Sequence, residues 1–148
     1  MLSIAHGVTG AFIATKIGNP LISFPIIIAS HFFEDWLPHW DVGTGLSRGL
    51  RTKKDAFLYE LVDLAVMSAL LYWFWQLGNP EIAWQAYYGA FVGLLPDFIA
   101  APKVFLNINL FFAKPIDKLH DMFHNSIPHK LLGLIPQAIV VLVIYFLR

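Results

Sequence analysis

Long apolar stretches, separated by short polar segments, dominate the chain. Five of them run over Leu2–Ile17, Pro20–Leu37, Ala56–Leu77, Ile82–Ala101 and Leu131–Leu147. An α-helix of about 20 apolar residues is long enough to cross the hydrocarbon core of a bilayer. The pattern therefore predicts an all-α fold, a polytopic membrane bundle of about five transmembrane helices.

Two Gly-Asn-Pro turn signals, at residues 18–20 and 78–80, join neighbouring stretches. Such short turns place consecutive helices side by side and antiparallel. Both turns are therefore expected on one side of the membrane, with the longer connections 38–55 and 99–130 on the other. Within the second connection, residues 116–127 alternate apolar and polar positions at helical spacing. This predicts a short amphipathic helix at the interface.

The composition agrees with a membrane protein. Of the 148 residues, 57% are hydrophobic and only 14% are charged, against roughly 25% charged residues in ordinary globular proteins. We therefore expect residues 1–148 to form a single integral membrane domain. The chain has no cysteine, so a metal ion would be held by histidines and carboxylates. The net charge of zero predicts no nucleic-acid partner.

The basic residues predict an orientation. Eight of the ten lysines and arginines lie in connections 38–55 and 99–130. Under the positive-inside rule, these connections and the N-terminus face the cytoplasm, in the cytoplasmic (inner) membrane of the cell.

The histidines and acids follow the same asymmetry. All six histidines, and nine of the ten acids, fall on the predicted cytoplasmic side, Glu81 being the exception. A carboxylate or imidazole within a membrane helix costs several kcal/mol unless it is paired, ligated or hydrated. The proline before Asp97 is expected to end the fourth helix and to place this acid at the same end.

Three pairs lie at spacings that present two side chains on one helix face. His31 and Asp35 are four residues apart, as are His120 and His124, while Glu60 and Asp63 are three apart. These spacings are typical of helices that offer two ligands to one ion. The candidate ligands, enough for one or two divalent ions, are His6, His31, Asp35, Asp63, Asp97, His120 and His124.

Other charged residues are candidates for catalysis and substrate binding. Glu34 and Glu60 are carboxylates that could accept a proton from an attacking water. Glu34 is expected to be solvated or to lie behind a ligand. The basic residues near the membrane surface are expected to hold an anionic headgroup; they are Arg48, Arg51, Lys53 and Lys54.

Some of these residues also have purely structural interpretations. His6, alone on an apolar helix, could be a packed and hydrogen-bonded histidine. Glu60 could be an interfacial charge near Lys53 and Lys54, which makes Asp63, one turn deeper, the preferred ligand of its pair.

Four short motifs resemble one family. They are His6 in the first stretch, Ser30-His31-x-x-x-Asp35, Gly93-Leu94-Leu95-Pro96-Asp97, and His120-x-x-x-His124-Asn125-Ser126. Together they resemble the YdjM-like small membrane-bound predicted metal-dependent hydrolases, whose motifs are similar to those of zinc-dependent phospholipase C. The resemblance implies a helical fold, a zinc-type site of His and Asp, and hydrolysis of a phosphoester.

The sequence thus leads to one main hypothesis and one alternative. The main hypothesis is a membrane-embedded, metal-dependent hydrolase that acts on a membrane lipid phosphoester at the cytoplasmic leaflet through metal-activated water. The alternative is a non-enzymatic membrane protein, either an ion or proton carrier or a structural partner, that uses the same polar cluster. A carrier should distribute ionisable groups through the membrane depth, whereas here they gather on one side.

Overall fold

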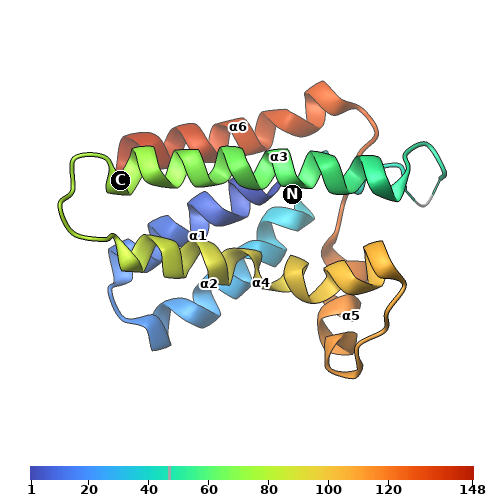
Figure 1. The fold of residues 1–148 in the computed structure, drawn as a ribbon, viewed down its shortest axis with the longest axis horizontal. Coiled ribbons are helices and arrows are strands. Elements are labelled where there is room, and N and C mark those ends of the chain that lie inside the picture. Colours follow the sequence, from blue (N-terminus) through green and yellow to red (C-terminus); the bar gives the residue numbers. More distant parts are fainter. Residues whose placement is uncertain (47) are drawn as a thin grey trace.

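The fold is helical throughout residues 1–46 and 48–148, the part of the chain that this computed structural model describes. Figure 1 shows the arrangement of its helices. They are α1 (Ser3–Ile17), α2 (Pro20–Trp36), α3 (Lys53–Leu71), which a π-helical turn η1 (Tyr72–Gln76) extends, α4 (Trp84–Leu106), a 3-10 turn η2 (Phe111–Ala113), α5 (Lys114–Phe123) and α6 (Lys130–Leu147). The prediction of an all-α fold is therefore confirmed for these residues.

The boundary between α1 and α2 follows from local chemistry. Gly18 ends α1 with a left-handed backbone, φ 73°, which costs glycine little because it has no Cβ. The side chain of Asn19 then accepts a hydrogen bond from the Leu21 backbone nitrogen at 2.9 Å and caps α2. Pro20 occupies the first helical position, where its missing N–H is not needed.

Helix α1 lies at the centre of the bundle and contacts α2, α3, α4 and α6. Its closest neighbour is α4, because two glycines face each other across the contact. A side chain on Gly10 would collide with the backbone of Gly89, and a side chain on Gly89 would collide with Gly10 and Ala14. Small residues of this kind let two helix backbones approach closely inside a membrane bundle.

Among the described residues, three helical segments are long and apolar enough to cross a membrane: Lys53–Gln76, Trp84–Leu106 and Lys130–Leu147. The prediction of about five transmembrane helices is therefore not supported. Helices α1 and α2 contain only 15 and 17 residues, because Gly18 ends one and the residues before Pro38 end the other. Their apolar composition instead reflects burial in the bundle for α1 and an exposed apolar face for α2.

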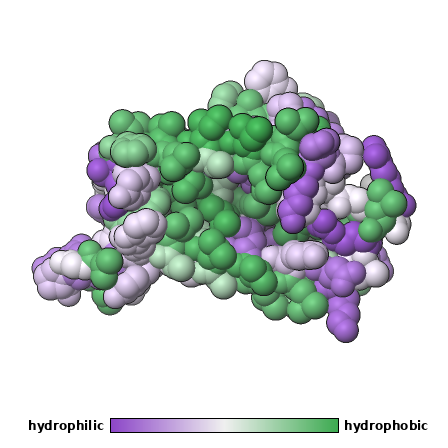
Figure 2. All heavy atoms as spheres, turned by 90° about the horizontal axis from the view of Figure 1, so that it is seen from above, coloured by the Kyte–Doolittle hydropathy of each residue, from purple (hydrophilic) through white to green (hydrophobic). Residues whose placement is uncertain are grey.

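The outer surface carries many exposed, large apolar side chains on α2, α3 and α6, among them Ile22, Phe24, Val62, Trp73 and Leu142. Figure 2 shows that apolar residues cover the middle of one face, while hydrophilic residues gather toward its two ends. A band of this kind is far larger than the apolar patches of soluble monomers and is typical of a membrane-facing surface.

The connections separate to opposite ends of the bundle, as the turn signals predict. In Figure 1 the α1–α2 turn and the loop before α4 lie at one end, and the connections around α5 lie at the other. The predicted amphipathic helix is present as α5, which contacts α2 and α4. The structure thereby brings α5 to the end of α2, where the buried acids and histidines lie.

The α1–α4 contact gives a stability prediction. Replacing Gly89 with Leu forces a side chain into the Gly10 backbone, and overpacking of this kind costs typically about 1–3 kcal/mol. We expect Gly89→Leu to lower the thermal unfolding temperature of the purified protein in detergent. The control is Ala65→Leu on the exposed face of α3, which should unfold as the unmodified protein does. Equal stability of the two variants would contradict the close helix contact.

Candidate metal centre

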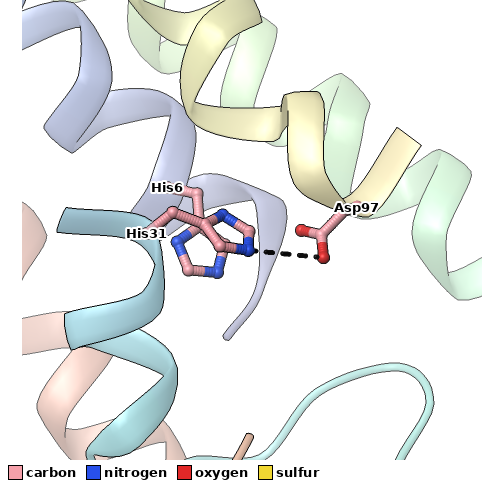
Figure 3. A group of neighbouring side chains, drawn as sticks. All are labelled: His6, His31 and Asp97. Atoms are coloured by element: carbon pink, nitrogen blue, oxygen red, sulfur yellow. Dashed lines mark ion pairs between the residues drawn. The ribbon is translucent and has the colours of Figure 1, made fainter. Parts of the chain in front are cut away.

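Histidines and aspartates from α1, α2, α4, α5 and the loop after α2 converge at one end of the bundle. Figure 3 shows part of this cluster, with His6 on α1, His31 on α2 and Asp97 on α4 turned toward one another. Within each of three overlapping groups, the ligand atoms lie within 4.8 Å of one another; the groups are His6, His31 and Asp97; His31, Asp35 and His120; and Asp35, His39 and His124. Six of the seven ligands predicted from the sequence are thus brought together.

His31 presents its Nε2 atom to the cluster. Its Nδ1 lies 2.8 Å from the backbone oxygen of Gly93, and because a carbonyl only accepts, Nδ1 must carry the proton. The unprotonated Nε2 of the neutral ring then lies 3.2 Å from His120 Nε2 and 3.5 Å from Asp35 Oδ2. It also lies 3.7 Å from Asp97 Oδ1.

His39 repeats this arrangement in the loop after α2, although the predicted ligands did not include it. Its Nδ1 donates to the Leu37 backbone oxygen at 2.8 Å. Its Nε2 lies 3.1 Å from Asp41 Oδ2 and 3.3 Å from His124 Nε2. The sequence contained a signal, because a proline immediately precedes His39 just as one immediately precedes Asp97.

His6 is oriented by a buried carboxylate. Its Nδ1 lies 2.8 Å from Glu34 Oε2, and the Thr9 hydroxyl donates to the other oxygen of Glu34. Its Nε2 lies 3.2 Å from Asp35 Oδ1, and its ring stacks on His31 with the ring centroids 3.9 Å apart. Glu34 therefore lies behind a candidate ligand, the second of the two positions expected for it, and it is not solvated.

Asp97 lies inside α4, and the expectation that Pro96 ends this helix is wrong. A proline in a helix interior removes one backbone hydrogen bond and distorts the turn before it. Here that turn contains Gly93, whose oxygen meets His31 Nδ1. The helix continues through Pro96 to Leu106, because α4 remains packed against α1 and α2 on both sides of the proline.

Backbone hydrogen bonds connect the segment after α5 to the end of α2. The His39 nitrogen donates to the Asn125 oxygen at 3.2 Å, and the Ile127 nitrogen donates to the His39 oxygen at 2.7 Å. The Asn125 nitrogen also donates to the Asp35 backbone oxygen at 2.9 Å. This short parallel bridge places His124 next to His39, which no helical spacing in the sequence could indicate.

The electrostatics around His39, Asp41 and His124 favour a charge separation between Asp41 and His124. Burial alone would raise the pKa of Asp41, but hydrogen bonds from His124 and His39 hold that pKa below its usual range. Burial opposes protonation of His124, yet the hydrogen bond to Asp41 raises the pKa of His124 above its usual value. A negative charge on Asp41 and a positive charge on His124 are therefore favoured together, as an ion pair.

Glu60 and Asp63 lie at the N-terminal end of α1 and not in the three groups. Asp63 Oδ2 accepts a hydrogen bond from the Ser3 nitrogen at 2.6 Å, and its Oδ1 faces the Ile4 nitrogen at 3.4 Å. Glu60 Oε1 accepts from the Ser3 hydroxyl at 2.6 Å. Both acids thus satisfy the free donors of the first turn of α1, which is a structural contact and not a ligand position.

The basic residues predicted to hold a headgroup divide into two kinds. Arg51 donates to the Val42 oxygen at 2.5 Å and lies over the Trp40 ring, 4.8 Å from its centroid. Lys53 donates to Asn107 at 2.6 Å. These two hold loops together, whereas Arg48 and Lys54 are exposed at the same end of the bundle.

The cluster is buried at its base and open on the side of α5. The side chains of His31 and His39 are fully buried, whereas those of Asp97 and His124 are 38% and 37% exposed. Asp97 and His124 are therefore the parts of the cluster that face outward. Comparison of the chain with protein family models, with characterised proteins and with solved structures gives no match.

The hydrogen bonds to backbone oxygens predict which histidine nitrogen carries the proton. In metal-free protein at neutral pH, we expect His31 to be protonated on Nδ1, because that atom faces an acceptor that has no proton to give. Nitrogen-15 NMR of histidine-labelled protein reports this tautomer, and a His31→Gln variant assigns the signal. The exposed His129 should show the averaged signal of a solvated ring. A His31 ring protonated on Nε2 would contradict the geometry.

Proposed function

We propose that the protein is a membrane-embedded, metal-dependent hydrolase of lipid phosphoesters, with the His and Asp cluster as its metal centre. The observation that carries this proposal is the state of Asp35. Its Oδ2 atom is buried and has no hydrogen-bond partner within the described part of the chain. An unpaired buried carboxylate oxygen is costly. A cation bound between Asp35, His31 and His120 would satisfy it.

The distances in the cluster support a transition-metal site. Two ligand atoms bound at about 2.0–2.1 Å to a tetrahedral zinc ion lie about 3.4 Å apart. The separation is 3.2 Å for His31 Nε2 and His120 Nε2, and 3.3 Å for His39 Nε2 and His124 Nε2. Neutral imidazole and carboxylate are ligands that zinc accepts. Two of the rings are held by hydrogen bonds to backbone oxygens, as expected for ligands oriented by a second layer of contacts, and the ring of His6 lies against Glu34.

Overlap between the three groups favours more than one ion. His31 and Asp35 each belong to two groups. Each of these side chains would therefore either bridge two neighbouring ions or bind one of them. Closely spaced divalent ions lower the pKa of a bound water and stabilise the negative charge that develops on phosphoryl oxygens. The ligand set, with no sulfur and with an opening on one side, suits this hydrolytic chemistry.

The chain's own carboxylates can be assigned separate roles. Glu34 is committed to His6 and Thr9, and Glu60 to Ser3, so neither is free to accept a proton from the attacking water. One oxygen of Asp97 belongs to the group with His6 and His31. We assign the proton-accepting role to its other oxygen, because the Asp97 side chain is exposed at the opening. Glu34 is a positioning residue for His6.

A lipid substrate follows from the surroundings of the cluster. Among the described residues, three helices are long and apolar enough to span a membrane, and one of them, α4, carries Asp97. Exposed Arg48 and Lys54 lie at the same end of the bundle. Basic side chains near a membrane surface attract anionic headgroups. The motifs that resemble the YdjM-like hydrolases support the same activity, and the clustering of basic residues supports a site at the cytoplasmic leaflet of the inner membrane.

A substitution at Asp35 tests the metal centre. Asp35→Asn keeps the side-chain volume but removes the charge that a cation needs. We expect the bound zinc, manganese or iron of the purified protein and its hydrolysis of phospholipid or polyprenyl phosphate to fall together, each by at least about tenfold, the range found for weakened metal sites. Helical content, measured by circular dichroism, should be unchanged.

The matched control is Asp121→Asn, which changes an exposed acid on α5 outside the three groups. This variant should keep both metal and activity. An Asp35→Asn protein that is more thermostable and equally loaded with metal would favour the non-enzymatic alternative, because it would mean that Asp35 is only a desolvated charge.

Cysteine labelling tests the orientation against a clean background, since the chain has no cysteine of its own. Glu81→Cys and Lys118→Cys place single thiols at opposite ends of the bundle. With a membrane-impermeant maleimide added to intact cells, we expect Glu81→Cys to react and Lys118→Cys to react only after the cells are broken. The reverse pattern would put the site on the outer side.

A further inference from the structure

An apolar groove lies between α2 and α5, on the outer side of the candidate metal centre. It has a volume of about 340 Å³ and is lined by Ala29, Phe32, Phe33, Trp36 and Phe123. This volume falls within the range of about 300–1,000 Å³ that is usual for small-molecule sites. The lining consists of apolar and aromatic side chains, so the groove suits a hydrocarbon and offers no partner to a charged or strongly polar group.

The inner wall of the groove is also the wall of the metal centre. The Phe32 ring lies with its centroid 5.1 Å from that of His31 and 5.4 Å from that of His120. Across the groove, Phe32 and Phe123 lie 6.2 Å apart, centroid to centroid. His120 and Phe123 are on the same helix, α5, one turn apart. A molecule in the groove therefore ends within one side-chain layer of the candidate ligands.

We propose that this groove binds a hydrocarbon chain of the substrate and places the adjoining phosphoester at the metal centre. The proposal rests on the proposed function and narrows its substrate class to phosphoesters that carry a long alkyl or isoprenoid chain next to the phosphate. Three features support this occupant. The groove and the metal centre lie on either side of Phe32, the side chain of His124 is exposed next to α5, and the rest of the exposed α2 face is apolar, with Ile22 and Ile26 facing outward.

A hydrocarbon chain fits these surroundings better than a second copy of this chain or another protein. The groove is contributed by a helix whose exposed face is apolar for most of its length, where lipid chains are the available molecules. The hydrophobic contact gives affinity for the hydrocarbon chain. The histidines and acids beyond Phe32 distinguish a lipid that carries a phosphate from one that does not.

The test narrows the groove without touching the metal centre. Ala29→Phe places a ring in the groove, and Ala65→Phe makes the same change on the exposed face of α3 as a matched control. For the full chain in phosphatidylcholine nanodiscs, kcat/KM is measured for a dodecyl phosphodiester and for a methyl phosphodiester with the same leaving group. We expect the dodecyl-to-methyl ratio to fall at least tenfold in Ala29→Phe and to stay unchanged in Ala65→Phe. An unchanged ratio in Ala29→Phe overturns the proposal.

A binding measurement separates failure of the groove from failure of the proposed function, because it needs no turnover. A dodecyl phosphonate with a diazirine at the end of its chain is photolysed on the protein, and the cross-linked residues are mapped by mass spectrometry. We expect cross-links on Phe33, Trp36 and Phe123 that excess dodecyl phosphonate removes and methyl phosphonate does not. These cross-links without hydrolysis of either ester would support the groove and refute the hydrolase. Hydrolysis without these cross-links would refute the proposal that the groove binds the hydrocarbon chain. So would a dimer of the protein in which the partner copy covers the groove and prevents the cross-links.

Discussion

The cost of burying charge in an apolar bundle controls the arrangement of this molecule. Asp35 is fully enclosed by α1, α2 and the histidines around it, and one of its oxygens has no hydrogen-bond donor among the described residues. In a protein with so few charged residues, such a position persists only if something compensates for it. The Met1 ammonium group forms an ion pair with one oxygen of Asp35, and His6, His31 and His39 each direct a ring nitrogen toward the same carboxylate.

Backbone oxygens orient the rings of His31 and His39. His31 and His39 each use one ring nitrogen to bind a main-chain oxygen, so the other nitrogen has only one direction available. The Leu37 oxygen lies just beyond the end of α2 and next to Pro38, and the Gly93 oxygen lies in the turn before Pro96 of α4. Both acceptors therefore lie within one helical turn of a proline.

Sequence reasoning recovered the helices and most of the cluster, and its failures have physical reasons. Helical spacing identified His31 with Asp35 because both lie on one continuous helix. His39 also lies four residues after Asp35, but α2 ends at Trp36 and the position of His39 is set by hydrogen bonds to residues more than eighty positions later. Helical spacing also selected Asp63, because a spacing of three residues shows that two acids share a face but does not show which helix end they cap. The number of spans was overestimated because a buried helix and a lipid-facing helix look alike in hydropathy.

The contact between Gly10 and Gly89 has a consequence for the response of the site to a deformation of the bundle. Backbones that touch directly cannot easily slide or rotate separately, so we expect α1 and α4 to move as one body when the bundle is deformed. His6 and Asp97 lie on that body and keep their separation. Helix α5 has no buried residue, and its main contacts with other described helices are with α2, α4 and the η2 turn. We therefore expect a deformation of the bundle to move His120 and His124 relative to the base formed by α1 and α4.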